Sequence, residues 1–389
     1  MDSVAQPDTI GHTVAKWASM VSYRSEIIAR SKVWPVSVAS ACDFKLGSPL
    51  EIDPRHLLDS PDWSLYAIDP DRGEATFVEL PEHIDLGDAP FAYTAQFEEA
   101  KSVVSLPLQV FIELSKDIQP TSTLAVLYST GRCGSTLASR ILAQIPGVWS
   151  ISEPDCLTNL SLARHSVSDD LILQLFTASR RFLCQLAPEA TNTIIKPRSE
   201  QVFQIEAFSR ANPDVQNIFL YRDAVRYANS MFRLAQRVTG QSDFLEDPNA
   251  TQLGWDFASA QAPAEEASRY LEEGQSNFDN LEAIVLAWVL RIRAAKEAFA
   301  SGIPIFPLHY ADLTSDRHKS TSLLLSGCGI GNKHLDIGLR GFDRDAHEGS
   351  STANSVPTKD LNDQQRQRVI HLLHRWEQEA LESGRLDFA

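Results

Sequence analysis

The sequence predicts an α/β fold with a mostly parallel sheet flanked by helices. Residues 124–145 combine an apolar run, a glycine-containing loop and an amphipathic segment, which is the pattern of a strand, a loop and a helix. Short apolar runs and helical segments then alternate as far as residue 312, and this order is typical of strand–helix–strand units in a parallel sheet. The length of 389 residues suits one large α/β domain with additions, or two domains.

Residues 1–120 are interpreted as an accessory segment packed on the core, and residues 121–389 as the core domain. We expect a helix over about 13–31, and a β-hairpin over 63–80, where the turn sequence DPDRG separates two apolar runs. A short helix over 107–118 leads into the first core strand. Because no long flexible linker follows, an independent N-terminal domain is the less favoured interpretation.

The first core strand and the loop after it form a candidate anion site. Leu124, Val126 and Leu127 make the continuous apolar run of a strand that is buried on both faces. The loop STGRCGST follows, and the next apolar residues recur at helical spacing: Leu137, Ile141, Leu142 and Ile145. A turn of this kind leaves backbone N–H groups at a helix N-terminus, where these groups and the helix dipole attract an anion.

Three further strands are expected to deliver polar residues to the same edge of the sheet. Glu153 follows the second strand, Lys196 and Arg198 end the third, and Arg222 follows the fourth. In open α/β sheets the ligand crevice lies outside the carboxyl ends of the strands, so these loops converge on one site. We expect these strands within 148–152, 191–199 and 218–221, with helices over 169–186 and 200–211.

The rest of the chain carries an insertion and three more elements. Residues 240–275 are rich in acidic and small residues, and we expect an inserted lid near the pocket. The elements expected after it are a helix capped by Asn277 or Asp279 and ended by Gly302, a strand running to Tyr310 and Asp312, and a helix over about 361–383.

Composition limits the partners. The formal net charge of −16 argues against a nucleic-acid backbone or an anionic membrane as the main partner, because either would repel the protein. The N-terminus lacks the features of a signal peptide, and no run of about 18 apolar residues occurs, so we expect a cytoplasmic protein with no membrane partner. The five cysteines are dispersed without CxxC spacing, which predicts reduced thiols and no structural zinc. The oligomeric state is not decided.

The loop departs from the two common nucleotide-binding patterns. In a Walker pattern GxxxxGK[ST] that starts at Gly131, Thr136 stands where the second glycine belongs, and no lysine follows. The dinucleotide fingerprint GxGxxG is absent because Gly131 and Gly134 are three positions apart. What remains is a phosphate loop with Arg132 inside it. A nucleotide-binding kinase or triphosphatase with a degenerate loop stays an alternative.

The segment STGRCGSTL resembles the 5′-phosphosulfate loop of the sulfotransferases that use 3′-phosphoadenosine 5′-phosphosulfate (PAPS). The segment IFLYRDAVRYANSM resembles the 3′-phosphate motif of the same family, in which an arginine ends a strand and a serine lies in the following helix; here these are Arg222 and Ser230. The resemblance covers about residues 121–389 and implies the P-loop-like sulfotransferase architecture. It also implies that PAPS binds through Arg132, Cys133, Gly134, Ser135, Thr136, Leu137, Arg222 and Ser230.

The same resemblance implies the catalytic residues. Sulfuryl transfer is an in-line displacement, in which the protein positions the groups and stabilises charge on the leaving oxygen. Arg132 is expected to stabilise this negative charge together with Lys196, and no metal is required. As the base, the family uses either a glutamate after the second strand, where this chain has Glu153, or a histidine in a later loop, where it has Arg198. We therefore expect Glu153 to be the base, with His165 as a reserve.

The acceptor is expected to be a small molecule that offers a hydroxyl or an amine. Acidic residues of the insertion favour a cationic acceptor: Asp243, Glu246, Asp247 and Asp256. A protein that keeps the fold and binds ligands without turnover stays open as a second alternative.

Overall fold

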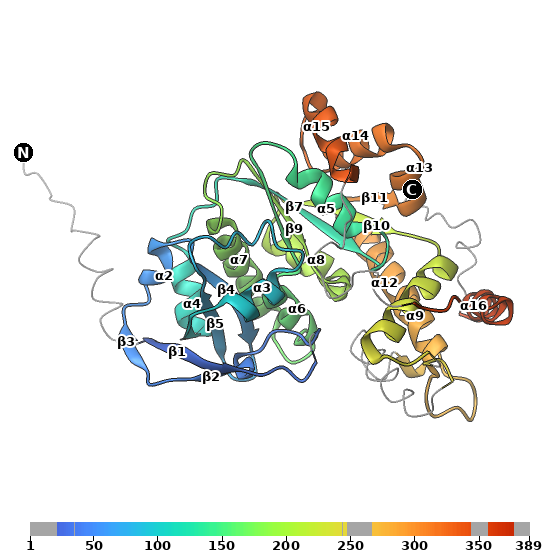
Figure 1. The fold of residues 1–389 in the computed structure, drawn as a ribbon, viewed down its shortest axis with the longest axis horizontal. Coiled ribbons are helices and arrows are strands. Elements are labelled where there is room, and N and C mark those ends of the chain that lie inside the picture. Colours follow the sequence, from blue (N-terminus) through green and yellow to red (C-terminus); the bar gives the residue numbers. More distant parts are fainter. Residues whose placement is uncertain (1–21, 35, 243, 247–266, 344–356, 377–389) are drawn as a thin grey trace, which may run out of the picture.

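The computed structural model describes residues 22–34, 36–242, 244–246, 267–343 and 357–376. This part of the chain contains an antiparallel sheet near its N-terminal end and a parallel sheet farther along, with helices around both (Figure 1). Most of the expected lid, 247–266, and the last residues of the final expected helix, 377–383, lie outside the described residues.

The N-terminal sheet begins with a strand where the sequence predicted a helix. Residues Ser22–Arg30 form β1, which pairs antiparallel with β6 (Ser102–Pro107). The helix expected over 13–31 is therefore wrong in its described part. The reason is tertiary: β1 pairs with residues 44–46, 50–52 and 102–105, and this pairing outweighs a local preference for helix.

The hairpin expected over 63–80 is confirmed, as is the short helix after it. The strands of the hairpin are β4 (Trp63–Asp69) and β5 (Glu74–Glu79), which pair antiparallel. The helix is α4 (Leu108–Ser115). The sheet has the order β2-β1-β6-β5-β4, with β3 also beside β1. The smaller elements are β2 (Phe44–Leu46), β3 (Leu50–Ile52), α2 (His56–Asp59) and α3 (Ala92–Glu99).

The second sheet has five strands in the order β11-β10-β7-β9-β8, and every neighbouring pair is parallel. This confirms the predicted α/β class. The strands are β7 (Thr123–Ser129), β8 (Val148–Ser152), β9 (Asn192–Lys196), β10 (Gln216–Tyr221) and β11 (Ile305–His309). The chain places β8 and β9 on one side of β7, and β10 and β11 on the other. The strand order thus reverses beside β7, which is where open α/β sheets bind their ligands.

Helices pack on both faces of the parallel sheet. The described helices after β7 are α5 (Ser135–Ala143), α6 (Asp155–Leu162), α7 (Asp169–Gln185), α8 (Ile205–Ala211), α9 (Ala224–Thr239), α12 (Asn280–Ala300), α13 (Tyr310–Ser315), α14 (Arg317–Gly327), α15 (Leu335–Leu339) and α16 (Asp363–Arg375). Of these, α16 packs on α9 and α12. Successive side chains of β7 point to opposite faces. Ala125 and Leu127 join an apolar cluster with α5 and α14, whereas Val126 and Tyr128 join a larger core with α7, α8 and α12 that continues into the N-terminal sheet.

A local capping signal fixes the start of α12. Asp279, one of the two expected caps, caps α12, because its side chain accepts a hydrogen bond from the Glu282 N–H while the Glu282 carboxylate accepts one from the Asp279 N–H.

Two other helices differ from the prediction. The helix expected over 200–211 begins instead as a 3-10 helix, Ser199–Gln204, before α8. The sequence prediction missed α6, which starts directly after Glu153 and Pro154.

Candidate active site

A cavity of about 650 Å³ lies at the carboxyl edge of the parallel sheet. Each of the five strands delivers at least one of its lining residues. These residues are Arg132 after β7, Glu153 after β8, Lys196 at the end of β9, Arg222 after β10 and Tyr310 after β11. The four loops that the sequence predicted to converge therefore do so, and a fifth joins them.

The loop after β7 has the backbone of a tight turn into a helix. Gly131 and Gly134 have φ angles of 80° and 82°, and Arg132 between them has a φ of 53°, a conformation that few side chains adopt. At Gly134 a Cβ atom would lie 2.8 Å from the ring of Tyr310, so only glycine fits there. The chain then enters α5 at Ser135, which places backbone N–H groups of the helix N-terminus at the cavity.

The residues predicted to bind PAPS do not all face the cavity. Seven of the eight line it: Arg132, Gly134, Ser135, Thr136, Leu137, Arg222 and Ser230. Cys133 is the exception, because its side chain is buried and the thiol donates a hydrogen bond to the Leu220 carbonyl at 3.3 Å. Burial raises the pKa of this thiol, so the side chain packs as a neutral group and only its backbone is left for a ligand.

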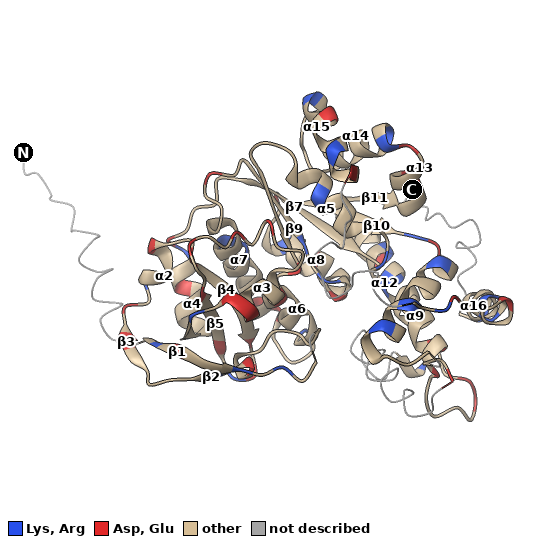
Figure 2. Cartoon of the chain, in the orientation of Figure 1, with Lys and Arg blue, Asp and Glu red and all other residues tan. Residues whose placement is uncertain are grey.

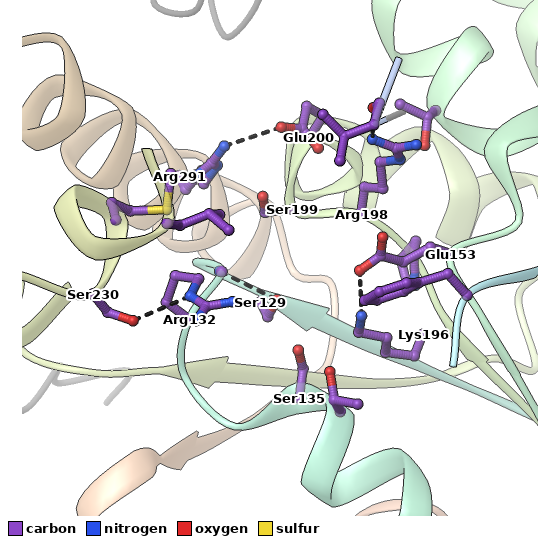
Figure 3. Close-up of a pocket in the computed structure, with 18 of the residues that line it drawn as sticks. Ser129, Arg132, Ser135, Glu153, Lys196, Arg198, Ser199, Glu200, Ser230 and Arg291 are labelled. Carbon is purple, nitrogen blue, oxygen red and sulfur yellow. Dashed lines mark hydrogen bonds and ion pairs between the residues drawn. The ribbon is translucent and has the colours of Figure 1, made fainter. Parts of the chain in front are cut away.

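The two sequence motifs meet in space. The Arg132 Nε donates a hydrogen bond to the Ser230 Oγ at 3.1 Å (Figure 3). The Arg222 guanidinium donates one to the backbone carbonyl of Arg132 at 2.7 Å. The resemblance assigns Arg132 to the 5′-phosphosulfate and assigns Arg222 and Ser230 to the 3′-phosphate. In the structure these two sets of residues are in direct contact.

The Arg132 and Arg222 side chains are partly buried cations at the cavity. Within the described residues neither guanidinium forms an ion pair, and Arg222 lies with its guanidinium 4.5 Å from the centre of the Tyr310 ring. Burial, together with Arg237 and Arg222, lowers the pKa of Arg132, and burial lowers that of Arg222. The Nε of Arg222 is buried and has no hydrogen-bond partner in the described part of the chain. A bound anion would satisfy these groups.

Helix α9, which carries Ser230, adds to this local positive charge. It contains Arg226, Arg233 and Arg237 and no acidic residue, and its arginines are blue in Figure 2. Two of them have carboxylate partners outside the helix, since Arg226 pairs with Asp223 and Arg233 with Asp360. The chain as a whole has a net charge of −16. A positive site within an acidic protein suits a small anion better than a polyanion.

The opposite end of the cavity holds a carboxylate and an ammonium in contact. The Glu153 carboxylate forms an ion pair with the Lys196 ammonium, and the Glu153 N–H donates a hydrogen bond to the Lys196 carbonyl at 2.6 Å (Figure 3). Glu153 has a φ of 55°, which is costly for a side-chain-bearing residue and is often found at functional sites. Its side chain is 18% exposed, so the carboxylate remains accessible from the cavity.

Arg198, which stands where the family histidine was expected, is in a buried ion pair. Its Nε and Nη2 donate hydrogen bonds to the two carboxylate oxygens of Asp155 at 2.6 and 2.8 Å. Burial disfavours the charged guanidinium, but Asp155 and Glu153 outweigh it and raise the pKa of Arg198. Arg198 therefore stays a cation with a fixed partner and cannot act as a base. His165 is exposed and does not line the cavity.

Sequence reasoning missed Arg291, which supports the phosphate loop from the core. This residue of α12 is 1% exposed, and its Nη1 donates hydrogen bonds to the Thr130 carbonyl at 3.0 Å and to the Tyr227 hydroxyl at 2.8 Å. Its Nη2 contacts the Glu200 carboxylate at 3.2 Å. The signal was an arginine directly after the apolar helical run 283–290, where a charge needs partners to be buried.

The described residues contain no helix that combines the length and the apolar character needed to cross a membrane. They also place no three His, Cys, Asp or Glu side chains together in a way that could hold a metal ion.

No protein-family model matches the sequence, and no curated protein matches it. Among solved structures, the chain is similar to sulfotransferase STF9 from Mycobacterium avium, with 13% identity, a TM-score of 0.42, and 72% of this chain and 82% of that chain covered. Sulfotransferase STF1 from Mycobacterium tuberculosis H37Rv is similar at 15% identity and a TM-score of 0.40, with 68% of this chain and 78% of that chain covered. The sulfotransferase domain from the curacin biosynthetic pathway is similar at 13% identity and a TM-score of 0.38, with 66% of this chain and 99% of that chain covered. All three are sulfotransferases, but at these TM-scores the activity of this chain has to be argued from its site.

Proposed function

We propose that the protein is a PAPS-dependent sulfotransferase of the P-loop-like architecture. The observation that carries the proposal is the contact of Arg132 with both Ser230 and Arg222 at the N-terminus of α5, where neither guanidinium has a carboxylate partner among the described residues. In PAPS the 5′-phosphosulfate and the 3′-phosphate are attached to one ribose. Two anion sites at one sheet edge, one on the loop after β7 and one on the residues after β10, match these two groups of the donor.

Each part of the site has a role in holding the donor. The backbone N–H groups from Cys133 to Leu137 and the Arg132 guanidinium would bind the 5′-phosphosulfate. Arg222 and the Ser230 hydroxyl would bind the 3′-phosphate. Arg291 would keep the loop in place through the Thr130 carbonyl, because a rigid loop loses little entropy when it binds.

Glu153 and Lys196 are suited to the transfer. When bound, PAPS supplies a sulfuryl group whose bond to the phosphate oxygen breaks as a bond to the acceptor oxygen or nitrogen forms, and PAP leaves with the electron pair. Glu153 would accept the acceptor's proton, in an orientation set by its ion pair with Lys196. Lys196 and Arg132 would stabilise the negative charge that develops on the leaving oxygen.

The direct test is incubation of the protein with radiolabelled PAPS and a metabolite extract, followed by mass spectrometry. A product that gains a sulfonate group, and that is lost with Glu153→Gln, would support the proposal. Tight, Mg²⁺-dependent binding of ATP would favour the kinase or triphosphatase alternative. Binding of PAP without any sulfonated product would favour a binding protein that keeps the fold.

A further inference from the structure

The cavity has a second wall that comes from the N-terminal part of the chain. Four lining residues precede the first strand of the parallel sheet: Val36, Val38, Phe91 and Tyr93. We name this set the acceptor wall. All four side chains are aliphatic or aromatic, whereas the donor end of the same cavity is built from the phosphate loop, Arg222 and Ser230. One cavity thus joins an anion site to an apolar surface.

Hydrogen bonds hold the acceptor wall against the strand ends of the parallel sheet. The Val36 carbonyl accepts a hydrogen bond from the Arg198 Nη1 at 2.8 Å. The next residues are fixed as well, because the Ala39 N–H donates to the Asp155 carboxylate at 2.9 Å. The Arg198 guanidinium lies 4.1 Å from the centre of the Tyr93 ring. These contacts hold the acceptor wall in a fixed position beside the strand ends.

The charged groups beside the acceptor wall already have partners. Lys196, whose ammonium lies 5.4 Å from the centre of the Phe91 ring, is paired with Glu153. Arg198 is paired with Asp155 through two hydrogen bonds. These two pairs cancel in charge, so the described residues at this end offer no excess charge to an ionic acceptor. An ionic group brought here would lose its water without gaining a counterion.

The acidic insertion does not supply such a counterion among the described residues. Glu246 is exposed and does not line the cavity. Asp243, Asp247 and Asp256, the other residues that led us to expect a cationic acceptor, lie outside the described residues.

We infer that the acceptor wall binds an uncharged hydroxyl compound with an apolar body. This inference rests on the proposed function, because the wall faces the same cavity as the donor site. The apolar body would pack on Val36, Val38, Phe91 and Tyr93, which would direct its hydroxyl toward Glu153. The N-terminal part of the chain would then determine acceptor specificity, while the parallel sheet binds the donor.

The first test is calorimetric titration of the protein saturated with PAP. One set of probes has a constant phenol shape: 4-ethylphenol is uncharged, tyramine is cationic and 4-hydroxyphenylacetate is anionic. An aliphatic set varies the charge in the same way: 1-hexanol is uncharged, 6-amino-1-hexanol is cationic and 6-hydroxyhexanoate is anionic. We expect the uncharged member of at least one set to bind about tenfold more tightly than its charged analogues, which is about 1.4 kcal/mol.

The outcomes separate this inference from the proposed function. If a charged analogue binds as well as the uncharged member in both sets, or if no uncharged member binds, the inference is wrong while PAP binding still supports the donor site. If the protein does not bind PAP, both fail.

A pair of valine substitutions tests the wall itself. Val38 lines the cavity, whereas Val33 in the same segment is 88% exposed and does not. We expect Val38→Asp to raise the affinity for tyramine relative to 4-ethylphenol about tenfold, and Val33→Asp to leave this ratio unchanged. Because both affinities are measured on one variant, any effect on PAP binding cancels in the ratio.

An unchanged ratio in both variants, or the same shift in both, would overturn the assignment of the wall. If Val38→Asp does not fold, Val38→Thr has nearly the same shape. It should lower the affinity for 4-ethylphenol about threefold, because the buried hydroxyl loses water, whereas Val33→Thr should not. Equal affinities in the two threonine variants would contradict the inference.

Discussion

The two ends of the cavity differ in how their charges are satisfied. At the donor end, Arg132 and Arg222 are partly buried cations without a carboxylate partner among the described residues. At the other end, Lys196 and Arg198 are each paired with a carboxylate. Unpaired buried cations need an anionic ligand, whereas paired charges hold one another in position before any ligand binds. The comparison separates residues that bind the donor from residues that are preorganised for transfer.

The largest effect is expected at the preorganised end. Glu153→Gln keeps the shape of the side chain but removes the base, so kcat should fall about 10²- to 10⁴-fold. Affinity for PAP, measured by calorimetry, should change little, because Glu153 does not belong to the donor end. Glu206→Gln, at an exposed position of α8, is the control. A fall in PAP affinity as large as the fall in kcat would remove the distinction between the two ends.

The next effect is on stability. Asp155 is fully buried, and Asp155→Asn would leave the Arg198 guanidinium without its counterion. We expect the free energy of unfolding, measured with urea, to fall by about 3–5 kcal/mol.

The chain offers a matched control for this pair. Asp214 makes the same two-bond contact with Arg180, but its side chain is 61% exposed. Asp214→Asn should therefore cost less than about 1 kcal/mol. Equal losses in the two variants would show that burial does not strengthen the Arg198–Asp155 pair.

At the donor end, Arg222→Ala should weaken PAP binding about 100-fold, because it removes a buried cation and its charge-assisted hydrogen bonds. Calorimetry with PAP measures this change. Arg226 does not line the cavity and its side chain is 66% exposed, so Arg226→Ala should leave PAP affinity within about threefold of the original. Similar losses in both variants would indicate general attraction of anions by α9, without a defined 3′-phosphate site.

The smallest effect is expected from the serine that joins the two motifs. Ser230→Ala removes one hydroxyl that contacts Arg132, so PAP affinity should fall about tenfold. Titrations with PAP and with AMP distinguish its role: a serine that binds the 3′-phosphate should affect PAP more than AMP. An equal change for both nucleotides would mean that Ser230 acts only by positioning Arg132.

Local sequence patterns predicted the parallel sheet well, but they could not predict β1. Strands such as β7 and β10 are continuous apolar runs bounded by turn residues, and this signal is contained within each strand. The strand β1 is stabilised by pairing with β6, whose residues lie about 80 positions away in the numbering. No local pattern in Ser22–Arg30 reports such a partner.

The residues that line the cavity also differ in whether local sequence could single them out. Arg132, Arg222 and Ser230 could be singled out because they belong to two short motifs, each of which directly follows a predicted strand. The partnership of Arg198 with Asp155, and that of Arg291 with the Thr130 carbonyl, could not, because each joins segments that only the fold brings together. The sequence also gave no sign that Phe91 and Tyr93 line the same cavity.

The central claim is that two adjacent anion sites bind the two phosphates of one nucleotide. The most direct measurement is calorimetric titration of the unmodified protein with PAP, AMP and Mg²⁺-ATP under one set of conditions. We predict that PAP binds about 100-fold more tightly than AMP, because only PAP carries the 3′-phosphate for Arg222 and Ser230. Equal affinity for PAP and AMP, or tighter binding of Mg²⁺-ATP than of PAP, would contradict the claim.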